Sequence, residues 1–237
     1  MPRAGLTKAG YVQAILDAIA AFESAGPAPP TLRTRLILSV DRRNTPEEAL
    51  EVVALARQFR DAGVVGVDLC GDPSRGGIAA LGPALAQVHA IPGLGLTLHF
   101  AEAESSGTDE ELRMLLGWNP GRLGHVIHVS DAVKREIAAR GGLGLELCLS
   151  CNVHAQMITG GFEAHHFGEW WKVEECVVVL SVSFARADAH AVASVPWPAV
   201  NVAWMLYDAD LSVRPMTWES LGAPCRTSML SWPNILA

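Results

Sequence analysis

The sequence has few of the features that hold an extracellular or membrane-bound protein in place. Its five cysteines, at positions 70, 148, 151, 176 and 225, are too few and too scattered for a disulfide framework, which favours a reducing compartment. No apolar run reaches about 18 residues, the length needed to cross a bilayer. The first apolar stretch is interrupted by Gln13 and Asp17, so it predicts an amphipathic helix and not a signal peptide. We therefore expect a cytoplasmic protein without a membrane partner.

Charge is also sparse, and its sign is informative. Charged residues make up 18% of the chain, and 18 basic against 25 acidic side chains give a net charge of −7. This balance excludes a generally basic nucleic-acid binder. Half of the 237 residues are hydrophobic, which supports a sizeable buried core and argues against disorder. The length suits one large α/β domain or two small ones.

Short β-rich apolar runs alternate with helical segments along most of the chain. An amphipathic helix is predicted first, from Leu6 to about Glu23, with its apolar face at Tyr11, Ile15, Ile19 and Phe22. The expected strands span residues 34–41, 64–69, 94–99, 122–129, 145–150 and 177–182. This alternation predicts a parallel sheet built from βα units. Six strands suit either an incomplete eight-stranded barrel or an open doubly wound sheet, so counting alone leaves the topology open.

The sequence changes character at about residue 184. The remaining stretch has no lysine, holds four of the seven tryptophans, and is broken repeatedly by proline. No period of 2 or 3.6 persists in it, although residues 200–211 could form one strand or one helical turn. We predict an α/β body over residues 1–183 and a divergent tail of uncertain structure over residues 184–237.

Polar residues stand at the ends of several expected strands. They are Asp41, Asp68, Gly71, Asp72, His99, Glu102, His125 and Asn152. In parallel α/β folds these strand ends share one face, and that face carries the functional site. His99 with Glu102 suits a metal-binding imidazole beside a general acid. One such pair is more often a buried core histidine beside an exposed acid, but polar residues on several strands favour a site.

Seven ordered segments then resemble one known family, the adenosine deaminases, and within it the branch that hydrolyses N6-methyl-AMP. The segments are LTKAGYVQAILDAI, LILSVDRR, GVVGVDLCGDP, LTLHFAE, RLGH, LELCLSCNV and HHFGEWW. The resemblance covers roughly residues 1–181. It implies an α/β fold of the (β/α)8 TIM-barrel type, of which this chain retains about six βα units, and it makes residues 1–183 a partial deaminase barrel.

The resemblance also implies roles for individual residues. His99 would be a zinc ligand, Glu102 the acid that protonates purine N1, and His125 the residue that orients the attacking hydroxide. Substrate binding would fall to Arg3, Asp41 and Gly71. A guanidinium suits a 5′-phosphate, and a residue without Cβ can approach a purine closely. The expected partner is thus a purine nucleotide, bound by a monomer with zinc as cofactor.

Departures from the family pattern concern the metal. The family takes two zinc ligands from a His-x-His pair and one from Thr-Asp-Asp; this sequence contains no His-x-His and has Ser181-Val182-Ser183 at the aligned strand end. One of four protein zinc ligands is retained, so we predict weak zinc binding and no deamination by this chain alone. A truncated product of a longer gene or an incorrect gene model would explain this pattern. The alternative is a catalytically dead nucleotide-binding or interaction protein.

Two further motifs are assigned no chemistry. Cys148 and Cys151 form a C-x-x-C without a second pair, on and just after an expected buried strand, which favours packing over redox or metal binding. His165-His166 resembles a stretch that is structural or peripheral in the family, so we leave it out of the metal set.

Overall fold

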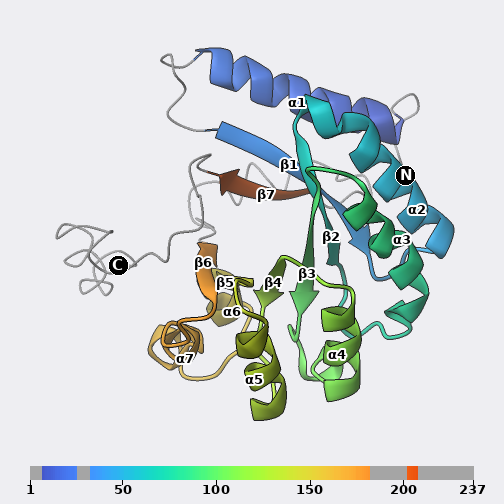
Figure 1. Cartoon of the computed structure of the whole chain (residues 1–237). Helices are drawn as coiled ribbons and strands as arrows, with labels where there is room; N and C mark the ends of the chain where they lie inside the picture. Colours follow the sequence, from blue (N-terminus) through green and yellow to red (C-terminus); the bar gives the residue numbers. More distant parts are fainter. Residues whose placement is uncertain (1–6, 26–32, 182–201, 208–237) are drawn as a thin grey trace.

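The core of the molecule is a parallel sheet. The structure, a computed structural model, describes residues 7–25, 33–181 and 202–207. Six strands run parallel to one another (Figure 1): β1 (Arg33–Asp41), β2 (Val64–Cys70), β3 (Gly95–Phe100), β4 (Arg122–His125), β5 (Gly144–Cys148) and β6 (Val177–Ser181). They follow the six runs expected from the sequence, with shifted ends.

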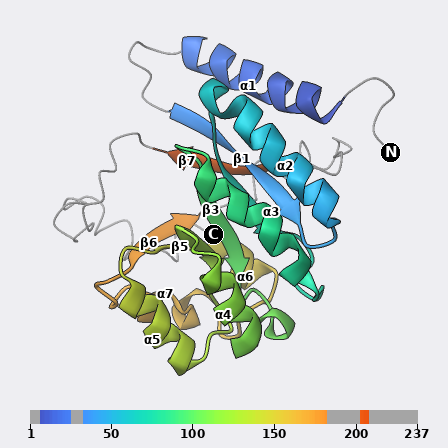
Figure 2. The same ribbon diagram turned by 45° about the vertical axis from the view of Figure 1, so that its right-hand side comes forward.

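Strand order decides the topology that counting left open. The sheet runs β6-β5-β4-β3-β2-β1, so each parallel strand lies beside its neighbour in sequence. A doubly wound sheet reverses its order at a switch point and places helices on both faces. Here no reversal occurs among β1 to β6, and helices α2 to α5 all lie in front of the strands in Figure 2. This is the winding of a (β/α)8 barrel, of which the sheet contains six strands.

One helix precedes β1 and the others lie between successive parallel strands in the sequence. The helices are α1 (Lys8–Ala25), α2 (Pro46–Phe59), α3 (Gly82–Ala86), α4 (Asp109–Gly117), α5 (Asp131–Arg140), α6 (Leu149–His154) and α7 (Phe167–Trp170). Helix α2 shows why the sequence forms them. Thr45 and Glu48 make a reciprocal capping box, Pro46 fills the first turn, and Gly63 ends the segment at φ +121°.

The first helix buries a different face from the one predicted. Val12 and Leu16 are its fully buried residues, Ile15 and Ile19 pack partly against the core, and Phe22 is 64% exposed. Polar contacts with the rest of the molecule are made at both ends of the helix, where Lys8 reaches Glu51 of α2 and Glu23 accepts from the backbone N–H of Thr34. Phe22 lies more than one turn beyond Leu16 and on another side of the helix, so it gains no partner.

Three other elements differ from the sequence expectation. The helical-looking sequence of residues 78–90 forms two 3₁₀ turns, Ile78–Leu81 and Gln87–Ala90, around the short α3, which opens at Gly82-Pro83. The strand expected to reach residue 129 ends at His125. The strand expected to reach residue 150 ends at Cys148, and α6 begins at Leu149. Both shortened strands end at the candidate site.

Side chains alternate between the two faces of the sheet. Leucine, valine and phenylalanine of β1, β2, β3 and β5 pack into one hydrophobic cluster beneath the helices: Leu36, Leu38, Val40, Val67, Leu69, Leu96, Leu98, Phe100, Leu145 and Leu147. The alternate positions of β2, β3 and β5 hold polar groups: Asp68, Thr97, His99 and Glu146. The apolar face therefore holds the fold, and the other face carries the chemistry.

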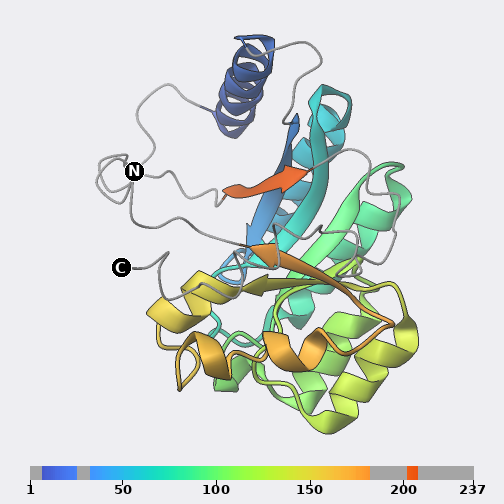
Figure 3. The same cartoon turned by 90° about the vertical axis from the view of Figure 1, so that its left-hand side faces the viewer.

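A seventh strand comes from the segment predicted as a divergent tail. β7 (Val202–Tyr207) pairs antiparallel with β1, in the register Arg35 with Met205 and Ile37 with Ala203. It lies along the edge of β1 away from β2 (Figures 1 and 3). The strand alternative for residues 200–211 is thus confirmed over six residues. The rest of residues 184–237 lies outside the described residues, as does Val182-Ser183.

Candidate active site

The candidate site is built where β3 and β4 end in unusual backbone conformations. Ala101, just after β3, has φ +50°, and His125 and Val126 at the end of β4 have φ +62° and +54°. Side chains other than glycine rarely adopt this region, at a cost of roughly 1–3 kcal/mol each. The amide of Val126 donates to the carbonyl of Phe100, 2.9 Å away, which ties the two strand ends together. Such strain is typical of functional sites.

His99, the expected metal ligand, lies in a charged environment made by β2 and β3. Its Nδ1 is 3.1 Å from the carboxylate of Asp68, which is buried. Burial lowers the pKa of His99, but the Asp68 carboxylate and the nearby Glu102 and Glu146 outweigh it and raise the pKa to about 9. Asp68 was among the strand-end residues of the sequence but not among the assigned site residues. The structure makes it the partner that orients His99.

Glu102 and His125, the two expected proton-handling residues, face one another. His125 Nε2 lies 3.5 Å from Glu102 Oε1, and both side chains are largely buried. The rings of His99 and His125 are 5.3 Å apart. Burial lowers the pKa of His125, which favours a neutral imidazole able to accept or donate a proton. Imidazole, carboxylate and imidazole are therefore gathered at neighbouring strand ends.

Asp41 and Gly71 form a second pair, at the same edge of the sheet. Asp41 ends β1 in register with Cys70, so Gly71 follows directly beside it. Gly71 has φ +103°, and a Cβ there would lie 2.6 Å from Asp41 Oδ1. Arg43 donates to both carboxylate oxygens, which lowers the pKa of Asp41. Asp41 therefore lies against the open side of Gly71, and the close approach of a purine to Gly71 stays a prediction.

A buried polar cluster lies on the same face of the sheet below these residues. Glu146 of β5 pairs with Arg122 of β4 at 2.7 Å, and Thr97 of β3 donates to it at 3.4 Å. Burial raises the pKa of Glu146, and Arg122 opposes that effect. The sequence pattern did not reveal this cluster because none of these residues lies at the carboxyl end of its strand. It links three strands beneath the site.

The HHFGEWW motif supports the strained end of β4 from a distance of about 40 residues. His166 Nε2 donates to the carbonyl of His125 at 2.7 Å, and Trp170 Nε1 donates to the carbonyl of Val126 at 3.4 Å. These are the carbonyls of the two left-handed residues. A structural role was expected for His165-His166, and His166 contacts the backbone carbonyl of His125 at the end of β4.

Asn152 and His165 complete the surroundings of His125. Asn152 is buried in α6, with its amide 2.7 Å from His125 Nδ1 on one side and 3.1 Å from His165 Nε2 on the other. The backbone N–H of Phe167 donates to His165 Nδ1 at 3.0 Å. Asn152 was among the strand-end polar residues of the sequence, but no spacing rule connects it to His165. Arg3, the remaining predicted site residue, lies outside the described residues.

Comparison with known proteins identifies the family. The sequence profile of the family described as adenosine deaminase matches residues 1–167. The chain belongs to the adenosine deaminase family. It is 34% identical over 182 residues to a protein named N6-methyl-AMP deaminase-L from Xenopus laevis, which covers 75% of this chain and 50% of the relative. The family resemblance noted in the sequence is thereby confirmed.

Solved structures of the family agree with this placement. The apo structure of the N6-methyl-AMP deaminase from Arabidopsis thaliana aligns with a TM-score of 0.66 at 29% identity, over 82% of this chain and 59% of that protein. An Arabidopsis relative complexed with IMP aligns with a TM-score of 0.65 at 30% identity, over 74% of this chain and 51% of that protein. This deaminase-family chain spans about half the length of the curated relatives it matches.

The donor set of this deaminase-family chain does not fit a complete zinc site. Over the described ranges, no group of three or more His, Cys, Asp or Glu side chains is arranged to hold a metal ion. A catalytic zinc ion requires three protein ligands and an open position. His99, whose Nδ1 lies at Asp68, provides one imidazole, and Glu102 faces His125, so the described residues do not supply three ligands. The described residues therefore do not form a zinc site of the family type.

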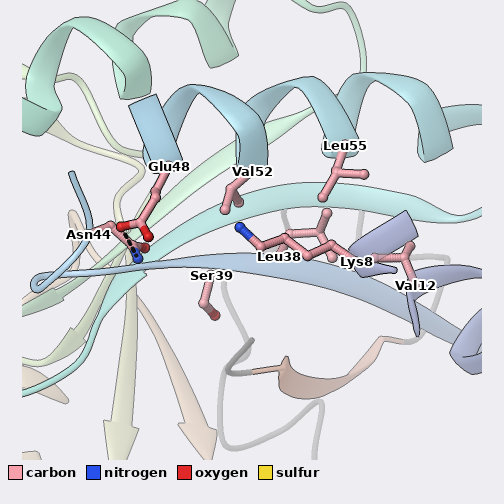
Figure 4. Close-up of a pocket in the computed structure, with 8 residues that line it drawn as sticks. All are labelled: Lys8, Val12, Leu38, Ser39, Asn44, Glu48, Val52 and Leu55. Carbon is pink, nitrogen blue, oxygen red and sulfur yellow. Dashed lines mark hydrogen bonds between the residues drawn. The ribbon is translucent and has the colours of Figure 1, made fainter. Parts of the chain in front are cut away.

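A small pocket elsewhere in this chain is separate from the candidate site. It lies between α1, β1 and α2 (Figure 4) and is lined by Lys8, Val12, Leu38, Ser39, Asn44, Glu48, Val52 and Leu55. Figure 4 shows Val52 and Leu55 on the helix side of β1, whereas the side chain of Ser39 points away from them. None of the strand-end residues of the candidate site lines this pocket.

Within the described part of the chain, no helix is long and apolar enough to cross a membrane.

Proposed function

We propose that this chain binds a purine nucleotide at the carboxyl ends of β1 to β4, in a site of the N6-methyl-AMP deaminase type. The observation that carries the proposal is the convergence of His99, Glu102 and His125 at neighbouring strand ends, with Asp68 behind His99. The relatives named N6-methyl-AMP deaminase and the family member complexed with IMP support the choice of ligand. The reaction of such a site converts N6-methyl-AMP and water into IMP and methylamine.

Each residue has a distinct part in this proposal. Glu102 exchanges a hydrogen bond and a proton with purine N1, because its partly exposed carboxylate is held by His125 on one side only. His125 orients the water that attacks C6. His99 faces the 6-position of the purine, and Asp68 fixes the orientation of its ring. Gly71 and Asp41 border the purine, and Arg3 binds the 5′-phosphate.

A second candidate function is nucleotide binding without turnover. It is favoured by the incomplete metal donor set, because no group of three or more His, Cys, Asp or Glu side chains in the described ranges is arranged to hold a metal ion. Zinc binding to this chain is therefore weak, and the deaminase chemistry does not proceed on the described residues alone.

Binding and turnover are separated by one set of measurements on the purified full chain. We expect IMP and AMP to raise the thermal midpoint, and Glu102→Gln to weaken this effect at least several-fold. Glu104→Gln, two residues along in the same loop and exposed, is the matched control and should bind as the unsubstituted chain does. Absence of any stabilisation by either nucleotide would overturn the proposal.

Methylamine release from N6-methyl-AMP, with added zinc and with bound metal measured, decides between the two functions. We expect no turnover and less than one zinc ion per chain. Turnover with stoichiometric zinc would show that the chain is an active deaminase and that the binding-only function is wrong.

We propose further that the protein is a cytoplasmic monomer that binds neither nucleic acid nor membrane. The net charge of −7 and the few, scattered cysteines of the sequence support this proposal. Light scattering coupled to gel filtration tests the oligomeric state, and a dimer at micromolar concentration would contradict the proposal.

A further inference from the structure

We propose that His165 is a positioning residue that determines which ring nitrogen of His125 carries its proton. The effect passes through the buried amide of Asn152, which lies between the two imidazoles. The inference deepens the proposed function and its catalytic meaning rests on it, because His125 is the group that faces Glu102.

Four contacts form an unbroken chain from the backbone to Glu102. The N–H of Phe167 lies 3.0 Å from His165 Nδ1, and His165 Nε2 lies 3.1 Å from the Asn152 amide. The other side of that amide is 2.7 Å from His125 Nδ1. His125 Nε2 is 3.5 Å from Glu102. His125, Asn152 and His165 are 4%, 0% and 6% exposed, so water has little access to replace a missing partner.

The backbone N–H at the start of this chain sets the direction of every later hydrogen bond. It can only donate, so His165 Nδ1 accepts and carries no proton. Burial and the neighbouring His166 lower the pKa of His165 to about 4, so the ring is neutral at pH 7. A neutral imidazole with a bare Nδ1 has its proton on Nε2. His165 therefore presents an N–H donor to Asn152.

That donor selects the orientation of the Asn152 amide. With Nδ2 turned towards His165, two N–H donors would face each other at 3.1 Å. The oxygen and nitrogen of a carboxamide have nearly the same shape, so a half-turn places Oδ1 against His165 without moving any other atom. In this orientation Asn152 accepts from His165 and donates through Nδ2 to His125 Nδ1. Both buried rings then have complementary partners.

His125 is left with its proton on Nε2, pointing at Glu102. The opposite tautomer would place the proton on Nδ1 against the Asn152 amide nitrogen and aim the bare Nε2 at a carboxylate. Asn152 and His165 thus hold an N–H donor towards the side of the site where Glu102 lies. A spacing of 40 residues separates His125 from His165, so this relation is visible only in the folded chain.

The test is the protonation pattern of His125 in the full chain, read from long-range ¹H–¹⁵N correlation spectra at pH 7.5. His125→Gln assigns the signals. In the unsubstituted protein we expect the Nε2–H tautomer. A dominant Nδ1–H tautomer of His125 would overturn the proposal by itself, whatever any variant does.

Variants at the two positioning residues sharpen the result. His165→Gln keeps an amide N–H donor near the Nε2 position, so the Nε2–H tautomer of His125 should persist. His165→Leu removes the donor, and that tautomer should lose its dominance. Asn152→Asp offers an acceptor to both rings and should place a proton on His125 Nδ1. An unchanged pattern in folded His165→Leu or Asn152→Asp would overturn the proposal.

The controls separate this inference from the proposed function. His154→Gln removes an exposed histidine of α6 and should leave the His125 signals unchanged. Circular dichroism establishes that each variant is folded. The expected tautomer in a chain that binds no nucleotide would leave the inference standing and overturn the proposed function. The wrong tautomer in a chain that binds IMP would do the reverse.

Discussion

Single residues at this edge of the sheet are held in conformations and charge states that their neighbours impose. His125 and Val126 keep a left-handed backbone because His166 and Trp170 donate to their carbonyls. Asp68 lies against His99 and raises its pKa. The site is thus built from pairs of contacting residues, and the effect of substituting one residue of a pair can be predicted from its contact with the other.

Gly71→Ala tests the closest of these approaches. The new Cβ would lie 2.6 Å from Asp41 Oδ1 on a backbone at φ +103°. We expect the free energy of unfolding, measured by urea titration, to fall by about 2 kcal/mol. Gly76→Ala is the matched control, because a Cβ there meets nothing within 4 Å, and it should change stability by no more than about 0.5 kcal/mol. Equal effects of the two substitutions would contradict the role of Asp41.

His165 predicts a dependence of stability on pH. Its folded pKa of about 4 lies below the ordinary value of 6.5, so the unfolded chain takes up a proton first as the pH falls. The contribution of neutral His165 is complete above pH 6.5 and is lost between pH 6.5 and 4. Compared with His165→Gln, the unsubstituted chain should therefore lose relative stability across this window. Parallel unfolding curves for the two proteins from pH 7 to 4 would contradict the assignment.

Whole helices and strands follow from local sequence where capping chemistry is strong. Helix α2 begins at a reciprocal hydrogen-bond pair, in which Glu48 N donates to Thr45 Oγ1 and Thr45 N donates to Glu48 Oε2. The same logic places Thr108 before α4 and Ser130 before α5. These ends were predictable because cap and helix lie within four residues of each other.

Thr45→Ala removes the side-chain acceptor of the α2 cap. The free energy of unfolding should fall by about 1 kcal/mol, because one backbone N–H of the first turn loses its partner. Thr45→Ser keeps the hydroxyl and should fall much less. Thermal or urea unfolding of the three proteins provides the measurement, and an equal loss for alanine and serine would mean that the cap hydrogen bond contributes little.

The elements that departed from expectation do so for reasons outside their own sequence. An apolar run such as residues 122–129 predicts a long strand, but β4 stops at His125 because tertiary contacts hold His125 and Val126 at positive φ. Phe22 has the right spacing for a buried face and finds no neighbour. His99, Glu102 and His125 were predictable because parallel strands end together. His165 was not, because its partner Asn152 lies 13 residues earlier, in α6.

The molecule as a whole is a sheet with two different edges. β6 forms one edge through a parallel pair with β5, and β7 forms the other through an antiparallel pair with β1. The chemistry lies on the parallel strands, and β7 contributes backbone pairing beside them. β1, which ends in Asp41, is therefore paired on both sides, and residues 202–207 form one of its two partners.

A proline in β7 tests whether pairing with β7 stabilises β1. Ala203→Pro removes an N–H from the strand and disrupts its ladder opposite Ile37. We expect hydrogen exchange to accelerate at β1 amides directed towards β7 and to stay slow at those directed towards β2. Ala203→Val keeps the N–H and serves as the control. Uniform protection of β1 in the proline variant would show that β7 does not stabilise this edge.

The antiparallel course of β7 has a consequence for ring closure. A closed barrel of the family type needs a parallel neighbour on each side of every strand. On the side of β1 away from β2, this position is occupied by the antiparallel strand β7, which pairs with the main-chain donors and acceptors of β1 that a parallel strand would need. A parallel strand could pair with this side of β1 only after residues 202–207 had left it, so pairing of β7 and ring closure at β1 exclude each other.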